Sequence, residues 1–390
     1  MCDPPTQVVE KLQSCSSLNI TGDFSMPESS GPDGRVTDLE RKLQAKQEEI
    51  AQLKRKLKLS YRDNSILELL TDEMKDFITP ISPLPSIIDV SKNQEAENVE
   101  HLVMHISDQH ADQVVIPSHV GGTENYNLTV ALCRAEKYVE TTLDFTRNMV
   151  SRSFPVLWML FYGDHVSGEI HGAEPKSFYR NMFRNSIAVG EMNALMIRDL
   201  APFFRQINIL CLPGNHGRRS IKKDYEGARN NWDYLVFETM RMLTKEITNL
   251  QIMIPDCYSY NVDINGYGFS IFHGDDILSY NSLPWYGIER KTRRLTALNS
   301  SIGKTVQYYV FGHFHKSTMM QDLNGETIIN GSWVATTPFL YERFSSYSEP
   351  YQWIHGVHPR HGITWRLPVN LRDQKKEKIG PDRYSITLPE

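Results

Sequence analysis

The chain has 390 residues, of which 40% are hydrophobic and 23% are charged, and these proportions are typical of a globular protein with a sizeable core. Its net charge of -5 gives no overall attraction to nucleic acid, so any such binding must depend on local basic patches. The five cysteines are scattered and lack CxxC spacing, which argues against a disulfide framework and against a zinc knuckle.

Two features of the sequence bear on location. No apolar run approaches the ~18 residues that a membrane-spanning helix needs. The first residues, Met-Cys-Asp-Pro-Pro, lack the basic-then-apolar order of a secretory signal. We therefore expect a cytoplasmic protein that does not enter a membrane.

The N-terminal quarter divides into three segments by composition. Residues 1–36 are rich in Ser, Pro, Gly and Asp, and we predict a disordered tail because they cannot bury enough apolar surface to offset the entropy of ordering. Residues 37–78 have the Lys, Glu, Gln and Leu content of helices. Residues 79–98 contain several prolines and are predicted to be a linker.

The helical region contains a short heptad pattern, with a second helix expected over residues 64–78. The apolar heptad positions are Leu39, Leu43, Ile50, Leu53 and Leu57. Lys46 interrupts the series. About three heptads favour self-association through residues 39–57 slightly over a single amphipathic helix packed on the body of the protein, and both alternatives remain open.

From residue 99 onward, short apolar runs alternate with helical stretches, which is the layout of an α/β (α+β) fold with strands buried between helices. The predicted strands cover residues 102–106, 156–161, 207–212, 269–272 and 308–311. The predicted helices cover residues 129–149, 178–200 and 231–247. Ligands in such folds collect at the strand ends.

Each of the five strands is followed at once by residues that can bind a metal ion. The motifs are Asp108-x-His110, Gly163-Asp164, Gly214-Asn215-His216, His273-Gly274-Asp275 and Gly312-His313-Phe314-His315. Any one of them is common, because Gly, Asn and Asp dominate turns for backbone reasons. Five in order, each behind a strand, predict one metal centre. In the last motif we expect Gly312 to turn the backbone sharply, so that both histidines project in the same direction.

The order of these motifs resembles the calcineurin-like metallophosphoesterase superfamily across about residues 103–334. The segment Ile328-Ile329-Asn330-Gly331-Ser332 is similar to the Asn-Pro-Gly-Ser segment of that superfamily, without its proline. The resemblance implies a four-layer αββα sandwich with a dinuclear metal centre, preceded here by the N-terminal helical extension. Within the superfamily, SbcD-type DNA nucleases are the most similar in motif style and basic content.

The resemblance also implies a role for each motif residue. One metal ion would be held by Asp108, His110 and His315. The other would be held by Asn215, His273 and His313. Asp164 would bridge the two ions, and His216 would protonate the leaving oxygen after attack by a metal-bridging hydroxide. Carboxylate, amide and imidazole donors suit two divalent ions, with Mn²⁺ expected first and Fe or Zn as alternatives.

The sequence departs from the superfamily pattern after two motifs. Gly217 follows His216 where an acidic residue often orients the histidine, so another group must position His216. Asp112, Asp275 and Asp276 are candidates, although each can also be a solvated loop acid. His165 follows Asp164 and is predicted either to contact the substrate or to be a structural loop residue.

Two basic clusters are candidate phosphate contacts. The first follows the catalytic histidine and comprises Arg218, Arg219, Lys222 and Lys223. The second covers residues 290–294, behind the aromatic stretch 280–286, and aromatic rings beside arginines suit single-stranded bases. The alternative for both clusters is an ordinary solvated surface, and for the second cluster that alternative is favoured.

These observations predict a catalytic domain over residues 99–340, followed by an aromatic-rich extension and exposed tail over residues 341–390. The first function hypothesis is a metal-dependent phosphodiesterase, and more narrowly a nuclease acting on DNA. The second is a phosphatase or phosphodiesterase for a small molecule or a phosphoprotein. The third, of another class, is a metal-binding scaffold without catalysis, which the competent residue at every motif position disfavours.

Overall fold

The structure is a computed structural model of the whole chain. It describes residues 41–48, 50, 66–75, 77–87, 99–150, 153–170, 177–179, 181–220, 222–223, 225, 227–278, 283–372 and 380–387. The predicted tail 1–36 and most of the heptad region and linker lie outside the described residues.

Two units are distinguished, residues 1–62 and residues 63–390. In the first unit, residues 41–48 and 50 are helical, and the side chains of Leu43 and Ile50 are 62% and 50% exposed. Exposed apolar side chains at heptad spacing are what a coiled-coil partner would cover. Self-association through residues 39–57 stays a prediction.

The second unit contains a six-stranded sheet in the order β11-β10-β1-β2-β3-β4. Its strands are β1 His101–Ile106, β2 Val156–Tyr162, β3 Gln206–Leu212, β4 Leu250–Met253, β10 Tyr351–His358 and β11 Gly362–Asn370. β1 to β4 are parallel, whereas β10 pairs antiparallel with β1. Parallel strands are covered on both faces, which explains why β1, β2 and β3 appear in the sequence as nearly continuous apolar runs.

A second sheet has five strands in the order β5-β6-β7-β9-β8. Its strands are β5 Ser259–Ile264, β6 Tyr267–Phe272, β7 Tyr308–Phe311, β8 Thr318–Asp322 and β9 Gly325–Ile329. β6, β7 and β9 are parallel, and the two edge strands run antiparallel to their neighbours. The carboxyl ends of the central strands of this sheet therefore point the same way.

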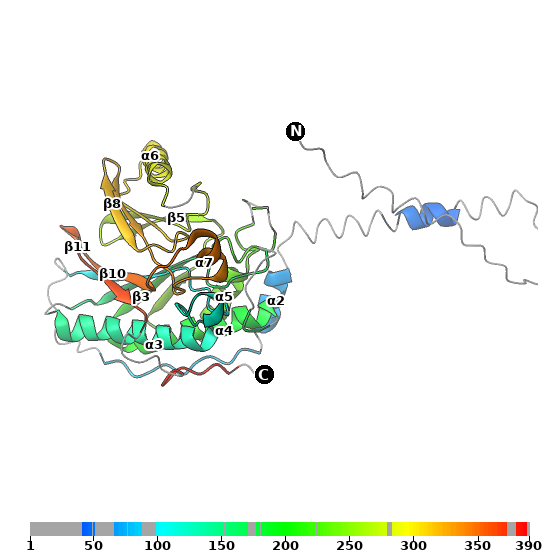
Figure 1. Cartoon of the computed structure of the whole chain (residues 1–390), viewed down its shortest axis with the longest axis horizontal. Coiled ribbons are helices and arrows are strands. Elements are labelled where there is room, and N and C mark those ends of the chain that lie inside the picture. Colours follow the sequence, from blue (N-terminus) through cyan, green and yellow to red (C-terminus); the bar gives the residue numbers. More distant parts are fainter. Residues whose placement is uncertain are drawn as a thin grey trace, which may run out of the picture. The chain divides into compact units, whose positions relative to one another are not determined.

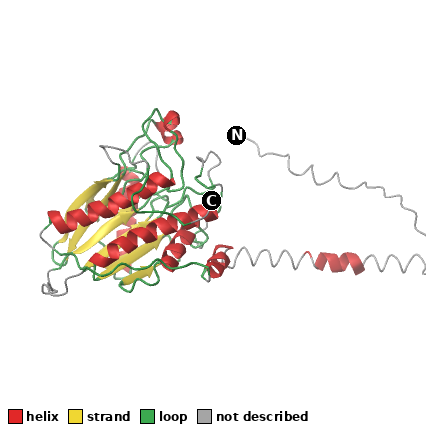
Figure 2. Cartoon of the chain, turned by 90° about the horizontal axis from the view of Figure 1, so that it is seen from below, coloured by secondary structure: helices red, strands yellow, loops and turns green. Residues whose placement is uncertain are grey.

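Successive side chains of β1 point to opposite faces of the first sheet, and this explains how the layers are packed. Leu102 and Met104 pack in the cluster shared with the helices, whereas the intervening Val103 packs with Phe269 and Val310 of the second sheet. The two sheets thus face each other, with helices on both outer faces (Figures 1 and 2). The predicted αββα sandwich is confirmed.

Three helices cover the outer face of the first sheet, and each begins at an asparagine whose side chain accepts a backbone N–H of the first turn. They are α3 Leu128–Asp144, α4 Met182–Leu200 and α5 Trp232–Leu243. α6 (Trp285–Ser301) packs on the second sheet through Ile288, which is buried with Tyr309 and Phe311. A short helix, α2 (Ile66–Met74), packs its Leu67 against Leu235 of α5.

The segment predicted as a C-terminal extension is part of the domain. After α7 (Pro338–Phe344), β10 and β11 complete the first sheet next to β1. The described segment 380–387 is also docked on the domain: Tyr384 is buried, and the Glu136 carboxylate accepts the backbone N–H groups of Asp382, Arg383 and Tyr384. The described part of the linker is anchored too, because Ile81 donates its N–H to the Leu243 carbonyl. No helix in the described ranges meets the length and hydropathy needed to cross a membrane.

Candidate metal centre

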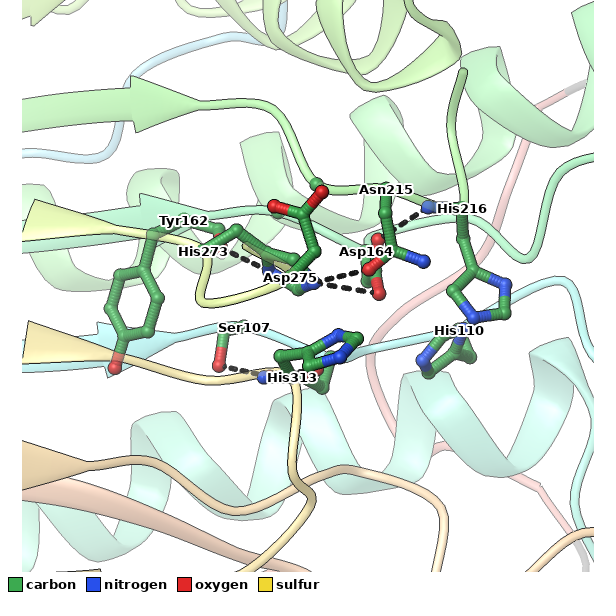
Figure 3. A network of polar contacts seen from close by, with 12 residues as sticks. Ser107, His110, Tyr162, Asp164, Asn215, His216, His273, Asp275 and His313 are labelled. Carbon is green, nitrogen blue, oxygen red and sulfur yellow. Dashed lines mark hydrogen bonds and ion pairs between the residues drawn. The ribbon is translucent and has the colours of Figure 1, made fainter. Parts of the chain in front are cut away.

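The five motifs meet where strands of both sheets end. In the first sheet, β1, β2 and β3 are followed by Asp108, Asp164 and Asn215, and in the second sheet β6 and β7 are followed by His273 and His313. Figure 3 shows Asp164, Asn215, His273 and His313 close together. Parallel strands place their carboxyl ends at one edge of a sheet, so a site between two such sheets receives residues from distant parts of the chain.

The first donor group consists of Asp108, His110 and His315, whose potential ligand atoms lie within 4.8 Å of one another. The Nε2 atoms of His110 and His315 are 3.3 Å apart, and His315 Nε2 is 3.4 Å from Asp108 Oδ1. Asp108 is fully buried. Three donors converging at these distances can hold one divalent cation.

The second donor group consists of Asp164, His273 and His313. His273 Nε2 lies 2.9 Å from Asp164 Oδ2 and 3.0 Å from Asn215 Oδ1, which adds an amide oxygen to the group. The opposite nitrogen, His273 Nδ1, is 2.9 Å from the Tyr162 carbonyl oxygen. Because a carbonyl only accepts hydrogen bonds, this contact protonates Nδ1 and turns Nε2 toward the donor group.

Asp164 connects the two groups. It belongs to the group of His273 and His313, and also to a group with His110 and His216 within the same 4.8 Å limit. His110 in turn belongs to the first donor group. Asp164 therefore shares a donor group with residues from both sets.

The backbone at these residues is strained. Seven described non-glycine residues have a positive φ, and five of them are donors: Asp108, His110, Asp164, His313 and His315. A left-handed conformation costs such residues of order 1–3 kcal/mol each and persists only where the surroundings enforce it. Strain of this kind is typical of functional sites.

Backbone hydrogen bonds enforce the strained turns. The N–H groups of Asp108 and His110 donate to the carbonyls of Gly163 and Asp164, so the two loops run side by side beyond the strands. Side chains from β10 and from the segment after β9 hold the Asp108 loop from the side opposite Gly163. Asn330 donates to both Ser107 Oγ and Gln352 Oε1, and Ser107 Oγ donates to Asp108 Oδ2 at 2.6 Å.

The structure gives Gly312 a different role from the predicted one. Its own φ is not positive, and the turn falls on His313 and His315, with φ of 67° and 55°. Gly312 is needed for space, because a Cβ there would lie 2.1 Å from Asp108 Oδ2 and 2.6 Å from Ser107 Oγ. The backbone of the fifth motif thus packs directly on a carboxylate of the first.

We expect Gly312→Ala to weaken both donor groups at once. The added methyl would displace Asp108 from the first group and shift the adjacent His313 of the second, and overpacking of this kind costs typically ~1–3 kcal/mol of folding stability. Metal content per chain and denaturant unfolding measure the two effects. Gly380→Ala is the matched control, since its nearest atom would be 4.0 Å away. Retention of both ions in Gly312→Ala would contradict the steric role.

The electrostatics of the donors fit divalent cations. Burial and the neighbouring His216 lower the pKa of His110 well below its usual range, and burial with His273 lowers that of His313 to about 4, so both imidazoles are neutral and can offer lone pairs. For Asp164, desolvation favours the neutral form, but His273 and His216 outweigh it and hold the pKa well below its usual range.

For His273, the effect of a neighbouring charge on the pKa outweighs the effect of burial. Burial alone would lower its pKa, but the Asp164 carboxylate raises it to about 10. The position therefore attracts positive charge, and a cation bound there would displace a proton from the imidazole. Mixed oxygen and nitrogen donors without a thiolate suit Mn, Fe or Zn.

Asp233 lies beside the donor groups, and the sequence did not indicate it. It is fully buried at the start of α5, and its carboxylate accepts the backbone N–H groups of Asp164, His165 and Gly214 at 2.9–3.0 Å. Burial, together with the charge of Asp164, raises its pKa to about 7. One carboxylate thus joins the second motif to the third, and no local pattern could have indicated this because the residues lie far apart in the sequence.

We expect Asp233→Asn to destabilise the protein by on the order of 1–3 kcal/mol, because the amide NH₂ would face at least one backbone N–H that now donates to a carboxylate oxygen. Urea unfolding of the two proteins under the same conditions measures the difference. Asp72→Asn is the control, since Asp72 is exposed on α2 and pairs with Lys75 across one turn. Equal stability of wild type and Asp233→Asn would rule out this role.

His216 lies at the edge of the first donor group. Its ring centroid is 4.7 Å from that of His110, and its backbone N–H donates to Asp164 Oδ1 at 2.8 Å. Its Nδ1 is 3.0 Å from the Ser167 carbonyl oxygen, which fixes the proton on Nδ1 in the neutral ring. The ring is half-buried, and Nε2 is the nitrogen opposite this contact.

His165 is not where a substrate could reach it. The residue is fully buried, its Nδ1 lies 2.7 Å from Gln109 Oε1, and its ring packs against Phe161 and Phe237. Burial lowers its pKa to about 3, so it is neutral. Of the two predicted alternatives, the structural one describes His165.

The first basic cluster divides into two parts. Arg218 is half-buried and its Nε donates to the Asn215 carbonyl at 3.0 Å, so its guanidinium borders the centre. Arg219 and Lys222 are exposed. Lys223 forms an ion pair with Asp275 at 2.8 Å, which neutralises its charge. The second cluster lies on α6, where Lys291 pairs with Asp276 and Arg293 with Glu289.

No protein-family model and no curated protein matches the chain. Similar solved structures include a hypothetical protein from Pyrococcus horikoshii OT3, at 10% identity and a TM-score of 0.35, covering 71% of this chain and 90% of that one. Vacuolar protein sorting 29 from Cryptosporidium parvum matches at 12% identity and 0.31, covering 67% and 86%. A novel archaeal phosphodiesterase matches at 12% and 0.30, covering 69% and 99%. At these scores the likenesses carry no argument.

Proposed function

We propose that the protein is a metal-dependent phosphoesterase that hydrolyses phosphodiesters at the centre between its two sheets. The observation that carries this proposal is the pair of donor groups connected through Asp164. Strained backbone at five donors and the neutral state of His110 and His313 support a site built for cations. The order of the motifs resembles the calcineurin-like metallophosphoesterases, which use such a centre.

Each predicted ligand has a place in the proposed centre. One divalent ion would be held by Asp108, His110 and His315. The other would be held by Asn215, His273 and His313, with Asp164 between the two ions. Two cations bound there would supply a nucleophile at neutral pH and stabilise the negative charge that develops on the phosphoryl group.

The remaining chemistry belongs to the side chains around the centre. His216 would give a proton to the leaving oxygen from Nε2 of its doubly protonated ring, because its Nδ1–H is held by the Ser167 carbonyl. Arg218 can hold a phosphoryl oxygen with its terminal nitrogens, since its Nε is fixed on the Asn215 carbonyl.

Within this class we propose a nuclease, in line with the motif resemblance to SbcD-type enzymes. The support is Arg218 beside the centre and the exposed Arg219 and Lys222 beyond it, which could follow a phosphate backbone. The ion pair of Lys223 with Asp275 removes one charge from that patch. Nothing specific favours a small molecule or a phosphoprotein, so those substrates serve as the alternatives in the test.

The test is an assay of the Mn²⁺-loaded full chain on four substrates: a generic phosphodiester, a generic phosphomonoester, single-stranded DNA and double-stranded DNA. The proposal predicts hydrolysis of the phosphodiester and of at least one form of DNA. Cleavage of the monoester alone would refute the nuclease. Failure to cleave any of them, with metal bound, would favour a scaffold.

A further inference from the structure

His216 Nδ1 faces a backbone carbonyl. Gly217 follows His216, and the atom that faces Nδ1 is the carbonyl oxygen of Ser167, 3.0 Å away. A carbonyl of a loop is a weak anchor unless the loop itself is held. We propose that Asp112 is the positioning residue for His216 and that it acts through the backbone of Ser167. This inference rests on the proposed function, because it assigns a role in the same reaction.

The Asp112 carboxylate is held in place as a hydrogen-bond acceptor. It is fully buried, and its Oδ1 accepts the Ser167 N–H at 2.7 Å. Its Oδ2 accepts from the Asn185 amide at 3.2 Å and from Ser177 Oγ at 3.4 Å. Ser167 is thus held at its nitrogen by Asp112 and holds His216 with its oxygen.

The next residue, Gly168, shows how closely this loop lies on the histidine. A Cβ at Gly168 would be 1.8 Å from the His216 carbonyl oxygen, and its φ is +70°. The backbone of residues 167–168 therefore contacts both the ring and the main chain of His216. Any movement of this loop would move the ring.

The other acids near the centre have different partners. Asp275 pairs with Lys223 at 2.8 Å, and Asp276 pairs with Lys291. Asp233 accepts backbone N–H groups of the second and third motifs. Of the three acids that the sequence offered for this purpose, Asp112 is the one whose contacts lead to His216.

The consequence for the reaction is specific. With Nδ1–H held on the Ser167 carbonyl, Nε2 is the nitrogen from which the doubly protonated ring would give a proton, and the ring keeps one orientation. Without the anchor, the ring would sample other orientations and the other tautomer. The loss should then fall on the protonation of the leaving group rather than on binding of substrate or metal.

The experiment uses a series of methyl aryl phosphodiesters whose phenol leaving groups run from nitro- to methoxy-substituted. Nitrophenolate leaves without a proton, whereas methoxyphenolate needs one. In Asp112→Ala, kcat should fall about 10- to 100-fold for the methoxyphenyl ester, which is the usual range for loss of a residue that orients another. The nitrophenyl ester should lose far less, with KM and metal content unchanged.

Four further variants protect the interpretation. Asp112→Asn keeps an oxygen that can accept the Ser167 N–H, so it should restore most of the activity. Gly168→Ala displaces the loop without touching Asp112 and should show the same dependence on the leaving group. Gly122→Ala controls for backbone strain, because Gly122 has a similar φ of +77° and nothing within 4 Å of its Cβ position. Asp199→Asn controls for loss of a buried carboxylate.

Two results would overturn the inference. One is an equal loss across the whole series, and the other is wild-type kinetics in Asp112→Ala. If the wild type hydrolyses no member of the series, the proposed function fails, and ¹⁵N NMR of the His216 ring then decides the structural part. Asp112→Ala should lose the pure Nδ1–H tautomer of the wild type, and an unchanged tautomer would refute the role of Asp112.

Discussion

Replacing Asp164 by asparagine is expected to abolish or greatly weaken the binding of both metal ions. The amide has the same size, so Oδ1 can still accept the His216 N–H and the fold should survive. What disappears is the negative charge next to His273 and the carboxylate that connects the two donor groups. A neutral amide is a much poorer bridge between two cations. Elemental analysis of dialysed protein measures the metal content per chain.

The matched control for Asp164→Asn is Asp199→Asn, which removes a buried carboxylate on α4 that pairs with Arg198 and Arg383 and contacts none of the donors. It should keep both ions. Full metal occupancy in Asp164→Asn would refute the bridging position. Loss of one ion with retention of the other would reduce Asp164 to an ordinary ligand of a single site.

Replacing His216 by alanine is expected to keep both ions and to slow hydrolysis by orders of magnitude. The backbone N–H that holds Asp164 remains, so the donor groups should keep their arrangement. General acid catalysis typically contributes ~10²–10⁴-fold, and a loss in that range is predicted for kcat with a poor leaving group. Single-turnover kinetics of the metal-loaded variant measure it.

His216 could also be a metal ligand, because its ring nitrogen lies within 4.8 Å of donor atoms of His110 and Asp164. Metal analysis of the same variant separates the two roles. Loss of an ion in His216→Ala would make it a ligand, and wild-type turnover with both ions bound would remove it from catalysis altogether.

The gathering of the predicted donors could be foreseen from the sequence because the relevant signals are local. A buried strand can be recognised from a run of apolar residues, and the donors of all five motifs follow their strands directly. The resemblance then assigned a role to each motif residue, and the structure gathers these residues at one edge. The layers were predictable for the same reason, since long amphipathic helices alternate with the strands.

What the sequence could not predict depends on contacts between distant residues. β10 pairs with β1 across some 250 residues, and its aromatic and histidine content suggested a surface extension instead. Asp233 contacts two motifs without any local pattern. Gly312 was correctly singled out but for the wrong reason: its missing side chain makes room for Asp108, a constraint that exists only in three dimensions.

The central claim is that two cations share Asp164 and that both are needed for hydrolysis. Titrating the full chain with Mn²⁺, while recording bound metal and phosphodiesterase activity together, tests it most directly. The account predicts two ions per chain and activity that appears only as the second site fills. Binding of a single ion, or full activity with one ion bound, would contradict it.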